Sequence, residues 1–124
     1  MNELSGIRVL IVEDEGFVAL LIEDMLQDLG CETVASVAGL QEACAIAETA
    51  EIDLAVLDVN LAGQHSFPVA EVLRERGVPF LFSTGYGTSA LPSEFSGCPV
   101  LAKPFSAKAF EQTLTVALAM KSAL

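Results

Sequence analysis

Apolar runs of strand length alternate with longer segments of helical period five times along the chain. This alternation is typical of βα units, which build a parallel sheet. We predict strands near residues 7–12, 32–37, 53–57, 79–83 and 99–102. We predict helices near residues 15–29, 39–50, 66–76, 88–95 and 106–122. The pattern therefore predicts an α/β protein with a five-stranded parallel sheet.

The first and last predicted helices have clear ends. Gly30 is expected as the C-cap glycine of the first helix, and Ser106 as the N-cap of the last. The buried stripe of the first helix is predicted at Val18, Leu21, Ile22, Met25 and Leu29. That of the last helix is predicted at Phe110, Leu114, Ala117 and Leu118. The helix at 88–95 is expected to be short or irregular, because glycines and a proline surround it closely.

Length and charge narrow the classes of protein. At 124 residues, 52% of them hydrophobic, we expect one domain over 1–124 with no output domain. The formal net charge is -11, and the six basic residues form no stripe. Nucleic acids and anionic membrane surfaces are therefore not expected partners.

The chain has the features expected of a cytoplasmic protein. No signal peptide and no apolar run of membrane-spanning length is visible. Three cysteines, Cys31, Cys44 and Cys98, match neither zinc nor redox spacing, so we expect buried free thiols.

Polar side chains follow four of the predicted strands. Glu13 and Asp14 follow the first, Asp58 the third, Thr84 the fourth and Lys103 the fifth. Ligands of a parallel α/β sheet bind beyond the carboxyl ends of its strands, so these side chains are expected to meet there. The set suits a metal-assisted phosphate site.

The carboxylates of this set require a counter-charge. Two of them about 4 Å apart repel by roughly 4 kcal/mol at an effective dielectric of 20. Oxygen ligands favour Mg²⁺, with Mn²⁺ as a second candidate. The alternative is that the acids cap a helix N-terminus; we accept it for Glu15, while Asp58 argues against it for Glu13 and Asp14. Lys103 precedes Pro104, so its peptide bond is a candidate for the cis form.

Four motifs, in order, make the chain resemble the receiver domains of two-component response regulators. They are Val-Glu-Asp-Glu at 12–15, Leu-Asp-Val-Asn-Leu at 57–61, Ser-Thr-Gly at 83–85 and Lys-Pro-Phe at 103–105. The segment at 82–87 resembles the stand-alone alphaproteobacterial FAT GUY type, with Ser83 in place of its alanine. The resemblance implies the flavodoxin-like strand order 2-1-3-4-5, with helices on both faces of the sheet.

The resemblance also implies roles for the site residues. Asp58 would be the phosphoacceptor, and Thr84 and Lys103 would contact the phosphoryl group. Asp14 and Asp58 would bind Mg²⁺ directly, Glu13 through water, and Asn60 through its backbone carbonyl. The donor would be a sensor histidine kinase or a phosphotransfer protein.

Two positions depart from the usual receiver pattern. Val100 stands where many receivers carry an aromatic switch residue, and Tyr86 is a candidate replacement. His65 lies alone in the loop after Asp58, and we assign it no role.

Three other functions are alternatives to this interpretation. A flavodoxin-like FMN carrier is disfavoured, because acids at 13–15 would repel the FMN phosphate. A haloacid dehalogenase-type hydrolase needs Asp-x-Asp after an early strand, whereas Asp58 lies mid-chain before Asn60. A receiver that docks without phosphorylation is the remaining alternative.

We therefore expect a phosphoacceptor, not an enzyme in the usual sense, that promotes its own phosphorylation and dephosphorylation. Its output would be an altered protein-binding surface formed by the fourth helix and fifth strand, or a role as phosphate sink. A monomer and a phosphorylation-dependent homodimer are both compatible with the sequence.

Overall fold

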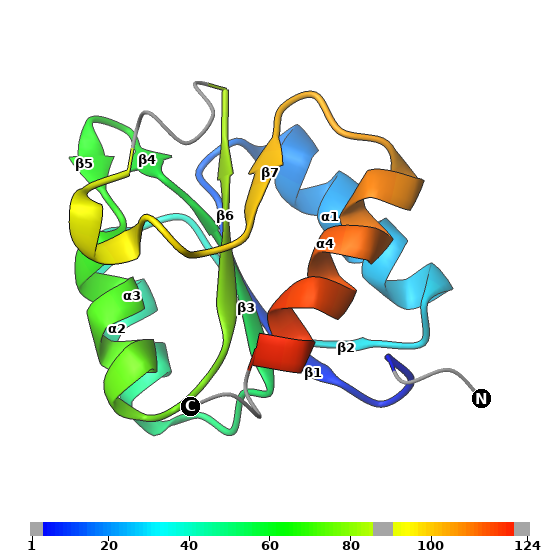
Figure 1. Cartoon of the computed structure of the whole chain (residues 1–124), viewed down its shortest axis with the longest axis horizontal. Coiled ribbons are helices and arrows are strands. Elements are labelled where there is room, and N and C mark those ends of the chain that lie inside the picture. Colours follow the sequence, from blue (N-terminus) through cyan, green and yellow to red (C-terminus); the bar gives the residue numbers. More distant parts are fainter. Residues whose placement is uncertain (1–3, 86–90, 121–124) are drawn as a thin grey trace.

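A computed structural model describes residues 4–85 and 91–120. A parallel sheet runs through the middle of the molecule, with α1 and α4 on one face and α2 and α3 on the other (Figure 1). Its strands are β1 (Arg8–Val12), β2 (Glu32–Val37), β3 (Leu54–Asp58), β6 (Phe80–Thr84) and β7 (Val100–Ala102). The helices are α1 (Gly16–Asp28), α2 (Leu40–Thr49), α3 (Phe67–Glu75) and α4 (Ala107–Met120).

The sheet has the predicted topology. Its strand order is β2-β1-β3-β6-β7, and every neighbouring pair is parallel. This order corresponds to 2-1-3-4-5 among the five predicted strands, so the fold class and the placement of helices on both faces are confirmed. The central strands β3 and β6 are buried along their whole lengths, which explains their nearly continuous apolar sequences.

Alternate side chains of the strands enter two separate cores. One core, under α2 and α3, includes Leu57 and Phe82. The other, under α1 and α4, includes Val56, Leu81 and Leu101. Because side chains alternate between faces along a strand, residues two apart share a core. This alternation continues to the strand ends and sets which side chains face each other there.

The predicted helix ends are confirmed, while one buried stripe needs correction. Gly30 follows α1 with φ +82°, as a C-cap glycine does, and Ser106 Oγ accepts the amide of Ala109 at 3.0 Å. On α1, however, Leu21 is 45% exposed, and the fully buried positions include Ile22 and Leu26. The packed face is therefore rotated relative to the predicted stripe.

Two other expectations differ from the structure. Of the predicted helix at 88–95, the described residues 91–95 contain only a 3₁₀ helix at Ser93–Phe95, and the rest lies outside the described residues. The three cysteines carry free thiols, as expected, yet are only partly buried. Burial is still sufficient to raise the pKa of each thiol.

A short hairpin after β3 was not predicted. Its strands are β4 (Asn60–Leu61) and β5 (Gln64–His65), which pair antiparallel.

Across the described residues, we find no helix with the length and apolarity that a membrane crossing requires.

Candidate phosphoacceptor and metal site

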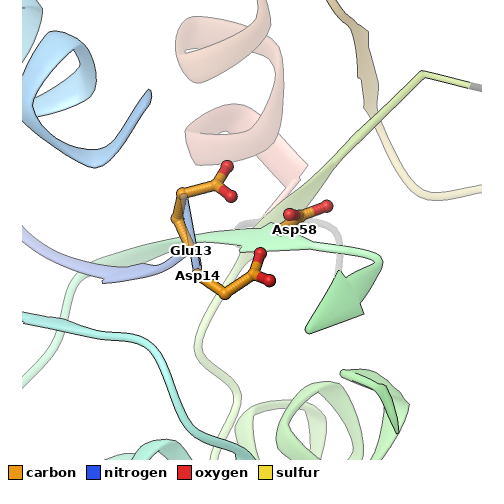
Figure 2. Close-up of side chains that lie close together, drawn as sticks. All are labelled: Glu13, Asp14 and Asp58. Atoms are coloured by element: carbon orange, nitrogen blue, oxygen red, sulfur yellow. The ribbon is translucent and has the colours of Figure 1, made fainter. Parts of the chain in front are cut away.

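The carboxyl ends of the strands bring three acidic side chains together. Glu13 and Asp14 follow β1, and Asp58 is the last residue of β3, the neighbouring strand. One carboxylate oxygen from each lies within 4.8 Å of the others, and Figure 2 shows the three side chains at this end of the sheet. The convergence predicted from the strand ends is therefore present.

The acidic side chains differ in burial. Glu13 is 3% exposed and Asp58 6% exposed, whereas Asp14 is partly exposed. Burial and, after it, the neighbouring Asp58 carboxylate raise the pKa of Glu13 to about 7, against the opposing effects of the Glu15 amide and Lys103. The surroundings of the cluster therefore favour the protonated, neutral form of Glu13.

Lys103 supplies the positive charge beside this cluster. Its Nζ lies 3.1 Å from Glu13 Oε1 and 3.2 Å from Asp58 Oδ2, and the peptide bond to Pro104 is cis. Burial works against the charged ammonium, but the two carboxylates outweigh that effect and raise the pKa of Lys103. The contact to Glu13 Oε1 lacks the direction of a hydrogen bond, so that oxygen keeps room for another partner.

Backbone amides fix the orientation of two carboxylates. The amide of Glu15 donates to Glu13 Oε2 at 3.1 Å, and that of Asn60 donates to Asp58 Oδ1 at 3.3 Å. The Asn60 side chain is occupied, because its Oδ1 accepts the amide of Gly63 at 2.9 Å.

Thr84 ends β6 at the same edge of the sheet. It is buried, and its register partner on β7 is Ala102. Its carbonyl accepts the amide of Lys103 at 2.9 Å, which ties the two strand ends together. Asp14, Asp58, Asn60, Thr84 and Lys103 all line one cleft of about 510 Å³.

The cleft also includes residues to which the sequence analysis gave no role in the site. Glu15 occupies the N-cap position of α1 without a side-chain capping hydrogen bond, and its carboxylate lies 4.0 Å from Lys103 Nζ. His65 and Ala62 line the cleft from the hairpin. No sequence motif indicated His65 or Ala62, because the β4–β5 hairpin, which was not predicted, brings them to the cleft. Tyr86, the candidate switch residue, lies outside the described residues.

Known proteins share this fold. Residues 9–115 match the Response regulator receiver domain family. The transcriptional regulatory protein TcrA of Mycobacterium tuberculosis is 35% identical over 112 residues, covering 85% of this chain and 43% of TcrA. The chain spans about half the length of the curated relatives it matches.

Two solved structures bear on the site. SdrG from Sphingomonas melonis Fr1 is 41% identical, with a TM-score of 0.82 over 92% of this chain and 97% of SdrG. SdrG has also been solved in a BeF3-activated conformation. The receiver domain of the sensor histidine kinase PA1611 from Pseudomonas aeruginosa PAO1, solved with magnesium in its active-site cleft, is 26% identical, with a TM-score of 0.78 over 93% of this chain and 99% of that domain. By the family match and the shared fold, the chain belongs to the response regulator receiver domain family of two-component systems.

Proposed function

We propose that this chain is a cytoplasmic receiver that accepts a phosphoryl group on Asp58. The donor is the phosphohistidine of a sensor histidine kinase or a phosphotransfer protein. The phosphorylated chain then alters a protein partner or serves as a phosphate sink. The observation that carries the proposal is the Asp58 carboxylate itself, which lines an open cleft beside two more carboxylates and the Lys103 ammonium.

The acidic cluster fits Mg²⁺, with Mn²⁺ as a second candidate. All its side-chain donors are carboxylate oxygens, which hard divalent cations prefer. Burial and the Asp58 carboxylate raise the pKa of Glu13, so a cation beside it would favour its ionised form. Asp14 and Asp58 would hold the ion directly, Glu13 through water and Asn60 through its carbonyl. When bound, the ion offsets negative charge on the phosphoryl oxygens.

The residues of the chain then perform the transfer. A carboxylate oxygen of Asp58 attacks the phosphorus, an O–P bond forms, and the N–P bond to the histidine breaks. The departing imidazole nitrogen keeps the electron pair and takes up a proton. Thr84 donates to a phosphoryl oxygen, and the Lys103 ammonium offsets the charge of another. Later attack by water on the phosphorus restores the Asp58 carboxylate, so the chain promotes both steps without being an enzyme in the usual sense.

Intact-mass spectrometry tests this function. After incubation with acetyl phosphate and Mg²⁺, we expect the protein to gain one phosphoryl group. Asp58→Asn should gain none, because an amide oxygen is a poor nucleophile. Asp24→Asn is the matched control: it makes the same charge change at an exposed position of α1, and it should be phosphorylated like the parent protein.

Two other outcomes would favour the rival functions. An unmodified parent protein would favour a receiver that docks without phosphorylation. Continuous hydrolysis of a phosphate monoester, without a retained phosphoryl group, would favour a hydrolase.

A further inference from the structure

Ser83 carries a fully buried hydroxyl without a hydrogen-bond partner. It is the penultimate residue of β6, it is 0% exposed, and its Oγ is unpartnered. Burying a hydroxyl without a partner lowers stability, and an alanine of nearly the same size would avoid that loss. The hydroxyl of Ser83 therefore makes no hydrogen bond that would stabilise the unphosphorylated protein.

The sheet register places Ser83 beside the phosphoacceptor. Its Cα is paired with that of Asp58 on β3 and with that of Leu101 on β7. Paired residues of parallel strands project from the same face of the sheet. Lys103 lies two residues after Leu101, and its amide continues the ladder to Thr84, so it shares that face. Ser83 thus lies between Asp58 and Lys103 on one face.

The two cores confirm this assignment of faces. Leu81, two residues before Ser83, lies with Leu101 in the core under α1 and α4. Phe82, two residues before Thr84, lies in the opposite core. The adjacent hydroxyls of Ser83 and Thr84 therefore project from opposite faces of the sheet and serve different neighbours.

Phosphorylation changes what holds the Lys103 ammonium. In the unphosphorylated protein, Asp58 Oδ2 is one of its two close carboxylate contacts. Once that carboxylate becomes an acyl phosphate, the negative charge moves to the phosphoryl oxygens and the ammonium must follow it. A lysine ammonium has three donors, so it can bind Glu13, a phosphoryl oxygen and one further acceptor at the same time.

We propose that Ser83 is a positioning residue for Lys103. Its hydroxyl oxygen accepts a hydrogen bond from the ammonium as the phosphoryl group reaches Asp58, and this bond holds the ammonium on the phosphoryl oxygens. The inference rests on the proposed function and assigns Ser83 to control of the phosphorylation rate. The described part of the chain has one more buried, unpartnered hydroxyl, on Ser66, which precedes α3 on the other face.

Ser66 provides the matched control. We would measure thermal unfolding and the rate of phosphorylation by acetyl phosphate for Ser83→Ala and Ser66→Ala. Both variants should unfold at the parent temperature or above, because each loses an unpartnered buried hydroxyl. Only Ser83→Ala should be phosphorylated more slowly, by about tenfold, the effect of one hydrogen bond to a charged group. Ser83→Thr, which keeps the hydroxyl, should recover part of the rate.

A double-mutant cycle tests whether Ser83 acts through Lys103. Ser83→Ala should slow the parent protein but cause no further slowing in a Lys103→Met background. Equal slowing in both backgrounds, or a parent-like rate for Ser83→Ala, would overturn the inference while leaving the proposed function intact. A parent protein that gains no phosphoryl group would instead refute the proposed function.

Discussion

At Glu13, the buried carboxylate that a metal site needs lowers the stability of the folded protein. Its carboxylate is almost fully buried next to Asp58, and only Lys103 brings a positive charge within 4.0 Å of it in the described structure. The folded protein therefore favours the protonated form, which explains why the pKa rises from 4.5 to about 7. Binding a divalent cation requires the opposite form. The same residue thus links stability, pH and metal binding.

The metal-free protein should lose stability as the pH rises from 4.5 to about 7. In this window the folded state binds more protons at Glu13 than the unfolded state does, so the free energy of unfolding falls with pH. The full loss is on the order of 3 kcal/mol. Urea denaturation with EDTA at a series of pH values measures it.

Glu13→Gln is the control for this pH dependence. The amide is similar in size and does not titrate, so the fall across this window should largely disappear. An equally steep fall in Glu13→Gln would assign the effect to other groups.

At the level of single residues, the sequence predicted which polar side chains lie together better than it predicted burial. Glu13, Asp14, Asp58, Thr84 and Lys103 were found because polar side chains at the ends of apolar strands have few structural uses. The state of each side chain depends on its neighbours across the sheet. The unpartnered hydroxyl of Ser83 and the raised pKa of Glu13 could therefore not be predicted from the sequence, because they depend on which residues the strand register places beside them.

At the level of elements, β1, β3 and β6 were predictable because they are almost wholly buried and their sequences are largely apolar. The β4–β5 hairpin was missed, because two residues per strand cannot show an alternating pattern. The helix predicted at 88–95 rested on a segment rich in glycine and proline, where local propensity is weak. Of that range, the described residues form only Ser93–Phe95 as a 3₁₀ helix.

The described residues 84–85 and 91–105 are joined to the site at two points. Thr84 and Lys103 both line the cleft and are linked through the backbone. Phe95 packs edge-on against Phe82, with ring centroids 5.5 Å apart, and the Arg74 guanidinium covers its ring at 4.4 Å. β6 and the 3₁₀ helix therefore contact each other directly, and we expect a shift at the end of β6 to move this helix as well.

Hydrogen exchange should detect this coupling. We expect protection of residues 84–105 to change on phosphorylation, because the new phosphoryl group attracts both ends of that segment. Residues 32–49, which include β2 and the whole of α2 and do not line the cleft, should keep their protection. Asp58→Asn treated in the same way should show no change. Unaltered protection of 84–105 in the phosphorylated protein would rule out this segment as the responsive element.

At the scale of the whole molecule, the acidic charge and the parallel topology act together. A parallel sheet gathers the ends of four strands at one edge, and in this chain three of the gathered side chains are carboxylates. With a formal net charge of -11, the rest of the protein supplies little compensating potential. The edge that creates the site therefore also concentrates repulsion there, and a bound cation should stabilise the entire fold.

Mg²⁺ should therefore raise the thermal unfolding temperature, and the rise should grow with the Mg²⁺ concentration. A ligand that binds only the folded state adds RT ln(1 + [L]/Kd), which is about 2.7 kcal/mol at a hundredfold excess over Kd. Asp14→Asn and Asp58→Asn should lose most of this shift, because each removes a carboxylate of the cluster. Asp24→Asn removes the same charge at an exposed position of α1 and should keep it. Differential scanning fluorimetry at constant ionic strength separates the two cases, since an equal loss in all three variants would indicate general charge screening instead of a site.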